Sequence, residues 1–333
     1  MLLHTHTNLR QVPSPSPVLH VVTVVSNPVG YKSRYTLLQR FVEHMRHFPV
    51  HLTVVEAAFG HREHVAPAAD RNVQLTIDHE LWHKENLINV GIQSLPPDWH
   101  YVAWLDADIH FTNPHWVNQT VQALQHHQLV QPWRDCIDLG PDGDAMQTHK
   151  SFGSQLQLGA PRNVTSGPSG YDLSGKVQAN AAFWHPGYAW AARREAVDHM
   201  GGLMDFPILG SADHHMAMAF IGDVLRSVPS NAHPNFKSKL LNFQDRVTKT
   251  IRQDVGFVAG TITHYFHGKK KNRKYAERWS VLTKNQFDPE TDIKKNWQGL
   301  WQLVDHGTRR SINLRDDIRA YFRQRHEDSI DLD

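Results

Sequence analysis

The sequence predicts an α/β protein built on a mixed, mostly parallel sheet flanked by helices, and three observations carry that prediction. A nearly unbroken β-branched run at 18–26 has the composition of a strand covered on both faces. Apolar residues at helical spacing follow over 35–48, and a second buried strand follows at 51–59. A third apolar run, at 101–109, contains two aspartates near its end. The β-α-β order is that of a Rossmann-like sheet, in which ligands bind at the carboxyl ends of the strands.

The remaining patterns complete this architecture. We expect a strand leading into a helix at 181–202 and a late strand at 254–268. Further helices are expected at 81–95, 113–127 and 212–226. The predicted organisation is a flexible tail at 1–17, one α/β domain at 18–282 with a mobile loop at 138–180, and a helical C-terminal extension at 283–333.

Composition excludes several classes of protein. The 333 residues carry 35 basic and 33 acidic side chains, so the formal charge of +2 implies no broad polyanion-binding surface. A single cysteine, Cys136, cannot form an internal disulfide, which indicates a reducing compartment. The N-terminal stretch is unlike a signal peptide, and no run of 18 apolar residues occurs. We therefore expect a cytoplasmic protein without a membrane span.

The paired aspartates are the first candidate site. In a strand, residues two apart point to the same face, so Asp106 and Asp108 should project together at the end of the run. Two carboxylates there repel each other unless a divalent cation joins them, and oxygen ligands suit Mg²⁺ or Mn²⁺. The alternative is a helix cap, for which Thr112 and Asn113 are better placed.

Four segments, in order, give a family resemblance. The stretch LDADIHF resembles the Asp-x-Asp motif of GT-A-fold glycosyltransferases, which hold the diphosphate of a nucleotide sugar through a divalent metal. Residues 184–203 resemble the segment of β-1,4-galactosyltransferase-like enzymes that shapes the sugar pockets. Residues 209–215 are similar to the stretch of that family that holds the proposed base, and residues 264–279 resemble its metal-binding terminus. The resemblance spans about 18 to 280 and implies a GT-A fold.

The resemblance assigns roles to individual residues. Asp108 would be the direct carboxylate ligand and Asp106 would meet the ribose or a water on the metal, while His264 and His267 would complete the coordination. Asp213 would be the base that deprotonates the acceptor hydroxyl. One departure is Ala212, where the family has glutamate. The alternative role of Asp213 is a helix cap, which Ser211 could equally supply.

Other residues are expected around the donor and the acceptor. Lys270 lies in a basic run over 269–274 that could neutralise the diphosphate, although a solvated surface or a nucleic-acid contact is equally compatible with it. By resemblance, the nucleotide would contact Asn27, Arg34, Glu56, Lys84 and Asn86. The acceptor would contact Trp184, His185, Tyr188 and His214, with core packing as the alternative for Trp184.

Two rival functions come from the same sequence. HELWH, at 79–83, satisfies the His-Glu-x-x-His pattern of zinc peptidases, but no third ligand follows at suitable spacing. A non-catalytic sugar- or nucleic-acid-binding protein would keep the fold and lose the chemistry. The favoured hypothesis is a metal-dependent hexosyltransferase, inverting, that uses a nucleotide sugar with Mn²⁺ or Mg²⁺ and a hydroxyl acceptor.

Overall fold

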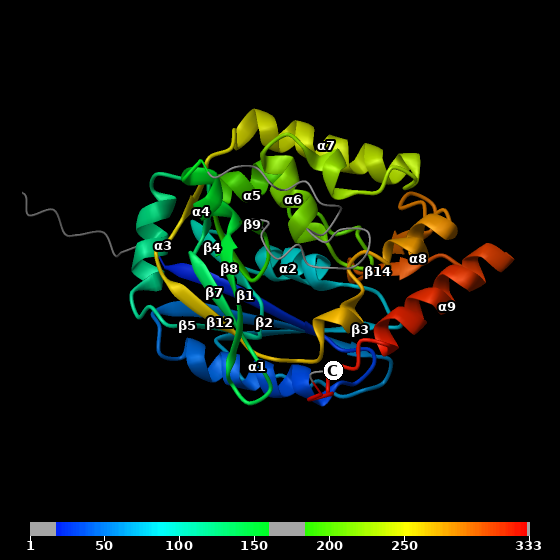
Figure 1. Cartoon of the computed structure of the whole chain (residues 1–333), viewed down its shortest axis with the longest axis horizontal. Helices are drawn as coiled ribbons and strands as arrows, with labels where there is room; N and C mark the ends of the chain where they lie inside the picture. Colours follow the sequence, from blue (N-terminus) through cyan, green and yellow to red (C-terminus); the bar gives the residue numbers. More distant parts are fainter. Residues whose placement is uncertain (1–17, 160–183, 332–333) are drawn as a thin grey trace, which may run out of the picture.

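A mixed seven-stranded sheet forms the centre of the protein (Figure 1), whose computed structural model describes residues 18–159 and 184–331. Its strand order is β11-β6-β10-β4-β1-β2-β3. Only β10 runs antiparallel to its neighbours β4 and β6. The predicted α/β class with a mostly parallel sheet is confirmed. The strands are β1 (Leu19–Ser26), β2 (Val50–Phe59), β3 (Arg71–Ile77), β4 (Tyr101–Leu105), β6 (Leu129–Gln131), β10 (Ala189–Arg193) and β11 (Val255–Phe257).

Helices cover both faces of this sheet, because successive side chains of β1 point to opposite faces and both sets are apolar. Val21 and Val25 are buried in the same core cluster as α1, whereas Val22 belongs to the cluster of α2. Gly91 of α2 lies so close to β1 that a Cβ there would be 2.6 Å from a methyl group of Val22. On one face lie α1 (Lys32–Met45) and α3 (Trp116–Leu124); on the other lie α2 (Lys84–Gln93), α5 (Arg194–Met200), α6 (Ala212–Phe220) and α7 (Pro234–Thr250) (Figure 1).

A second, five-stranded sheet carries part of the candidate site. Its order is β5-β12-β7-β8-β9. Strand β12 lies between β5 and β7, and its register places His264 opposite Ile109 on one side and Asp138 on the other. The last residue of β12 is therefore held next to the turn after β4. These strands are β5 (Ile109–Phe111), β7 (Asp135–Leu139), β8 (Ala145–Ser151), β9 (Trp184–His185) and β12 (Thr261–His264).

The expected loop at 138–180 is wrong in its first half. Residues 138–159 contain the end of β7, all of β8 and helix α4 (Phe152–Gln157), whose first turn is capped by the Ser151 side chain. Strand β8 is exposed at most positions and has no apolar alternation, so its sequence gives no strand signal. Residues 160–180 and the expected tail at 1–17 lie outside the described residues.

The segment after residue 282 combines a helix with a small hairpin that the sequence did not predict. Helix α9 (Arg309–Arg323) begins with a capping box formed by Thr308 and Ser311. It buries Tyr321 and Phe322 in the core. The other elements are the helix α8 (Trp279–Lys284), the hairpin strands β13 (Ile293–Lys295) and β14 (Trp301–Leu303), and two 3-10 turns, η1 (Val224–Ser227) and η2 (Lys270–Arg273). Whether 283–333 is a unit separate from 18–282 stays a prediction.

No helix in the described parts of the chain is long and apolar enough to cross a membrane.

Candidate functional site

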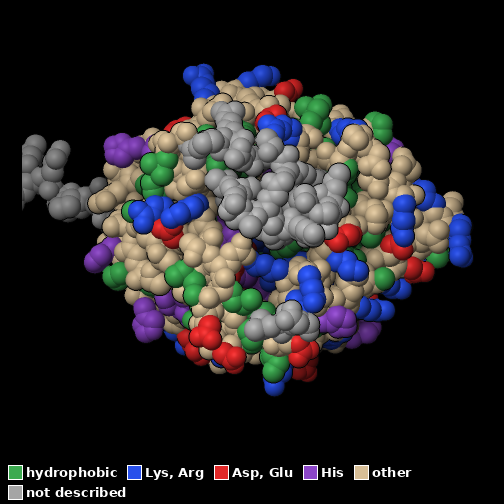
Figure 2. Space-filling view, viewed as in Figure 1, with side chains coloured by type: hydrophobic (Ala, Val, Ile, Leu, Met, Phe, Trp, Pro, Cys, Tyr) green, Lys and Arg blue, Asp and Glu red, His purple; other side chains and the backbone are tan. Residues whose placement is uncertain are grey.

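A cavity of about 470 Å³ opens at the carboxyl ends of β1 and β4. These strands are parallel neighbours, so the residues that follow them, Asn27 and Asp106, line the same space. The cavity is rich in charge, and Figure 2 shows Lys and Arg side chains gathered near the centre of this face of the molecule. Its charged lining comprises Arg34, Lys84, Lys150, Lys270, Arg273, Arg278, Arg325, Asp106, Asp108 and Asp213.

One group of side chains in this cavity has the spacing of a metal site. Oδ2 of Asp108 lies 3.0 Å from Nε2 of His267 and 3.6 Å from Nε2 of His264. The three ligand atoms lie within 4.8 Å of one another, and among the described residues no other such group occurs. Oδ1 of Asp108 is buried without a hydrogen-bond partner in the described part of the chain. A buried carboxylate oxygen without a partner beside two imidazoles fits a divalent cation.

Backbone pairing holds this group together. The Tyr265 amide donates to the Asp108 carbonyl at 2.8 Å, which continues the β12–β5 ladder into the turn after β4. His264 Nδ1 lies 2.7 Å from Oδ1 of the buried Asp138. A proton on Nδ1 leaves Nε2 facing Asp108, the carboxylate–histidine arrangement that orients metal-binding imidazoles.

Asp138 is a centre of hydrogen bonding in its own right. It accepts from His149 Nε2 at 2.5 Å, from the Tyr188 hydroxyl at 3.0 Å and from the Lys270 ammonium. Burial opposes its ionisation, but His149, His264 and Lys270 outweigh burial and hold the pKa of Asp138 far below its usual range. The sequence did not single out this residue.

The pKa values of Asp108 and His264 reflect their closeness in this group. Burial disfavours the ionised form of Asp108, yet His264 and His267 outweigh it and hold the pKa of Asp108 well below its ordinary value. Burial by itself would lower the pKa of His264. The neighbouring carboxylates of Asp108 and Asp138 have the larger, opposite effect and raise this pKa to about 9. Without a cation, a proton on the imidazole therefore balances the carboxylates.

Asp106 occupies a different place from the one expected. Strand β4 ends at Leu105, so the two aspartates lie in the turn after it and the same-face argument from strand geometry is wrong for them. Both still line the cavity, but Asp106 pairs with Lys84 at the start of α2 and does not belong to the three-residue group. Burial raises the pKa of Asp106, with Lys84 opposing the shift and Asp108 adding to it.

Asp213 lines the cavity from the first turn of α6. Gly187 makes room for it, because a Cβ at that position would lie 3.0 Å from Oδ2 of Asp213. Oδ1 of Asp213 accepts from the His214 amide at 2.8 Å. Ser211 precedes the helix with a φ of 77° and makes no capping bond; its hydroxyl accepts from Arg278 instead.

The aromatic residues expected around the acceptor divide into two groups. His185 and Tyr188 line the cavity with stacked rings, whose centroids are 4.1 Å apart and whose planes differ by 2°. His214 also lines it, and burial lowers its pKa to about 4. Trp184 does not line it, contrary to expectation: its ring packs against Phe152 in the core.

The residues expected around the nucleoside also divide. Lys84 and Arg34 line the cavity, and so does Asn27, although the Asn27 side chain also holds the amides of Gly30 and Tyr31. The other two residues predicted to contact the nucleotide, Glu56 and Asn86, do not line the cavity. The carboxylate of Glu56 accepts from the backbone amides of residues 65 and 66, at 2.9 and 2.8 Å.

Asn86 is likewise committed to the fold rather than to the cavity. Its side-chain oxygen accepts from the Trp301 amide at 3.0 Å and its amide group donates to the Gly299 carbonyl at 3.0 Å. Both Glu56 and Asn86 are buried polar residues that satisfy backbone groups. The expectation that they meet a nucleotide does not fit these positions.

Several cavity residues were missed in the sequence. From the predicted basic run, Lys270 and Arg273 line the cavity. Lining residues that were not anticipated include Tyr31, His149, Tyr275, Arg278 and Arg325. Arg278 directly precedes α8 and Arg325 follows α9, in charged stretches whose pattern resembles an ordinary solvated surface, so no local signal marks them.

HELWH does not form a zinc site. Residues 79–83 precede α2 and are not helical, so the two imidazoles do not share a helix face. The ring nitrogens of His83 face the carbonyls of Leu81 and Trp301, each at 3.0 Å. Glu80 pairs with Arg323. The peptidase hypothesis is therefore not supported.

No family model and no curated protein matches the chain. Among solved structures, it is similar to a β1,4-galactosyltransferase 7 of Drosophila bound to manganese, UDP-Gal and xylobiose, at 13% identity, covering 90% of this chain and 98% of that chain, with a TM-score of 0.38. It is also similar to a glucosyl-3-phosphoglycerate synthase of Mycobacterium tuberculosis bound to Mg²⁺ and UDP, at 11% identity, covering 86% and 87%, with a TM-score of 0.38. A 4-diphosphocytidyl-2C-methyl-D-erythritol synthase of Anaerococcus prevotii is 12% identical, covering 74% and 90%, with a TM-score of 0.35. At these scores, the function has to rest on the side chains of the site.

Proposed function

We propose that the protein transfers a sugar from a nucleoside diphosphate sugar to a hydroxyl acceptor with the help of one divalent cation. The observation that carries this proposal is the meeting of Asp108, His264 and His267 inside a cavity that also holds cationic side chains and a separate carboxylate, Asp213. A diphosphate donor needs its negative charge neutralised, and a hydroxyl nucleophile needs a base. The cavity offers groups for both tasks.

Asp108, His264 and His267 would hold the proposed ion, through a carboxylate oxygen and the two Nε2 atoms. Two imidazoles shift the preference away from Mg²⁺ toward a transition metal, and the carboxylate keeps Mn²⁺ well suited. When bound, such an ion acts as a Lewis acid on the departing diphosphate. Asp138 supports it by fixing the ring of His264 through the Nδ1 hydrogen bond of 2.7 Å.

Lys270 and Arg273 are the cations best placed to share the charge of the diphosphate. Both line the cavity next to the proposed metal ligands, and Arg273 Nη2 lies 2.9 Å from His267 Nε2. Nε of Arg273 is buried and has no hydrogen-bond partner in the described part of the chain. A guanidinium with a free donor is suited to a phosphate oxygen.

Asp213 is the proposed base. Its carboxylate lies in the cavity on the side of Gly187, near the stacked rings of His185 and Tyr188, which offer an apolar face to an acceptor sugar. It would take the proton of the attacking hydroxyl at a carboxylate oxygen, as an inverting displacement requires.

A thermal-shift screen of nucleotide sugars, each with and without Mn²⁺, tests the proposal. One donor should raise the melting temperature strongly only when Mn²⁺ is present, since ligands that bind the folded state stabilise it. The Asp108→Asn variant should lose this metal-dependent stabilisation. The matched control, His79→Asn, lies outside the cavity and should keep it. Stabilisation by donors that is identical with and without metal in the wild type would refute the metal-dependent mechanism.

A further inference from the structure

From the contacts of the C-terminal segment, we infer that Glu327 is a positioning residue for the metal ligand His267, so that the segment 321–328 is part of the proposed metal site. The inference rests on the proposed function, because it assumes that His267 binds the ion. It assigns a role in metal binding to a residue 60 positions beyond the ligand, within the last turn of the described chain.

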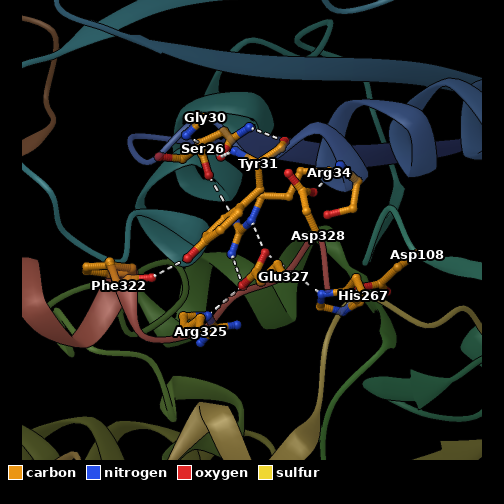
Figure 3. A network of polar contacts seen from close by, with 12 residues as sticks. Ser26, Gly30, Tyr31, Arg34, Asp108, His267, Phe322, Arg325, Glu327 and Asp328 are labelled. Atoms are coloured by element: carbon orange, nitrogen blue, oxygen red, sulfur yellow. Dashed lines mark hydrogen bonds and ion pairs between the residues drawn. The ribbon is translucent and has the colours of Figure 1, made fainter. Parts of the chain in front are cut away.

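Glu327 is a buried carboxylate placed between Arg34 of α1 and the proposed metal ligand His267 (Figure 3). Its side chain is 1% exposed, and Oε2 lies 3.8 Å from Nδ1 of His267. Nδ1 of His267 is itself buried and has no hydrogen-bond partner in the described part of the chain. An acceptor next to a buried ring nitrogen fixes the orientation and the tautomer of the imidazole. The Glu327 carboxylate is the acceptor that faces Nδ1 of His267.

Each of the two proposed imidazole ligands thus has a buried carboxylate facing its Nδ1 atom. His264 has Asp138 behind its distal nitrogen at 2.7 Å, and His267 has Glu327 behind its own at 3.8 Å. In both pairs the opposite nitrogen, Nε2, faces Asp108. Carboxylates behind metal-binding imidazoles fix the tautomer and raise the basicity of the ligand. A small approach of Glu327 would turn the second pair into a hydrogen bond.

Two arginines hold Glu327 in place. Arg34 from α1 donates to both carboxylate oxygens, at 2.5 and 2.8 Å, and also to the Ser26 carbonyl at the end of β1. Arg325 donates to Oε1 at 2.5 Å. Because the bidentate pair with Arg34 fixes the plane of the carboxylate, Glu327 is preorganised rather than free to swing toward solvent.

Backbone contacts dock the whole segment against the site. Gly268, the neighbour of His267, has a φ of +80°, and a Cβ there would come within 2.9 Å of the Glu327 Cα. On the other side, the Asp328 carboxylate accepts from the first amides of α1, Lys32 at 2.9 Å and Ser33 at 2.7 Å, while the His326 amide donates to the Tyr31 hydroxyl at 3.1 Å. The segment is therefore held on two sides, beside His267 and at the start of α1.

Mn²⁺ titrations of the full-length protein by calorimetry test the inference. Glu327→Gln keeps the size of the side chain and removes its charge, and it should weaken Mn²⁺ binding by about 10- to 100-fold. Asp328→Asn is the matched control: it alters the adjacent carboxylate, which docks the segment but does not touch His267, and its Mn²⁺ affinity should equal that of the wild type. Absorption spectra of bound Co²⁺ should change in Glu327→Gln and not in Asp328→Asn, because only the former changes the group behind the ligand His267.

Removing the charge weakens the ion pairs of Glu327 with both Arg34 and Arg325 and so destabilises the fold, and Glu327→Asp therefore provides a second variant. It keeps a negative charge for the two arginines while drawing the carboxylate back from His267, and it should still bind Mn²⁺ more weakly than the wild type. The inference is overturned if either folded Glu327 variant binds Mn²⁺ as tightly as the wild type. It is also overturned if Asp328→Asn weakens binding as much as Glu327→Gln, since docking alone would then explain the effect. A wild type that binds neither Mn²⁺ nor Co²⁺ would refute the metal site of the proposed function as well.

Discussion

Replacing Asp138 by asparagine is the most informative perturbation of the site, because this residue holds a proposed ligand without being one. Its carboxylate accepts from four groups, which are His149, Tyr188, His264 and Lys270. The asparagine oxygen can keep the bonds from His264 and Tyr188. Its amide group, however, turns donors toward the remaining two partners, which are donors themselves.

The magnitude follows from the bonds that are lost. Two charge-assisted hydrogen bonds, each contributing about 1.5–3 kcal/mol, disappear. The Lys270 side chain is 34% exposed, so water replaces part of its lost partner, and we expect a net destabilisation of about 3 kcal/mol. Loss of charge behind His264 should weaken Mn²⁺ binding by about 10- to 100-fold, which corresponds to about 1.4–2.8 kcal/mol.

Urea unfolding and Mn²⁺ calorimetry measure the two effects separately. Asp135→Asn is a matched control, because this aspartate lies on the same strand and pairs with Arg134 and Lys150 away from the metal group. Its Mn²⁺ affinity should be unchanged. If Asp138→Asn folds and binds Mn²⁺ as the wild type does, the reasoning that the orientation of His264 governs binding is wrong.

Three further perturbations have distinct expected outcomes. Asp213→Asn should keep the metal-dependent donor stabilisation but lower turnover by about 10²- to 10⁴-fold, and unchanged turnover would exclude it as the base. His79→Ala should leave Mn²⁺ affinity unaltered, because residues 79–83 are not helical and His79 itself does not line the cavity; a loss of affinity would instead support the zinc-peptidase hypothesis. Burial raises the pKa of Glu85 from 4.5 to about 7, so the stability of the wild type falls as pH rises between these values. In urea unfolding, Glu85→Gln should therefore be more stable than the wild type by about 3 kcal/mol at pH 8 and equal to it at pH 4. A destabilised variant at pH 8 would contradict the sign.

The sheet was predictable because its signals are strong and local, whereas the histidines of the proposed metal group were predicted from a family resemblance. The runs at 18–26, 51–59 and 101–109 are long apolar segments, and each coincides with a strand or its start. Polar residues after such strands meet at one edge of the sheet, which is where Asp108 lies. His264 ends β12 and His267 lies three residues later, and the pairing of β12 with β5 brings them to Asp108.

The missed and misplaced residues have a common physical origin. Glu56 follows the same rule as Asp108, being polar near the end of a buried strand, yet it is used by backbone amides of a neighbouring loop. Pattern alone does not distinguish a carboxylate that faces a ligand from one that satisfies the fold. Asp138 and Glu327 act through pairings 126 and 293 residues distant, with His264 and Arg34, and nothing in their local sequence encodes these partners.

Anomalous diffraction at the manganese edge, from crystals soaked with Mn²⁺ and a nucleoside diphosphate such as UDP, tests the metal centre most directly. We expect one strong peak within bonding distance of Asp108, His264 Nε2 and His267 Nε2, with the diphosphate next to it. A structure in which saturating Mn²⁺ gives no peak at these three side chains would contradict the proposed site.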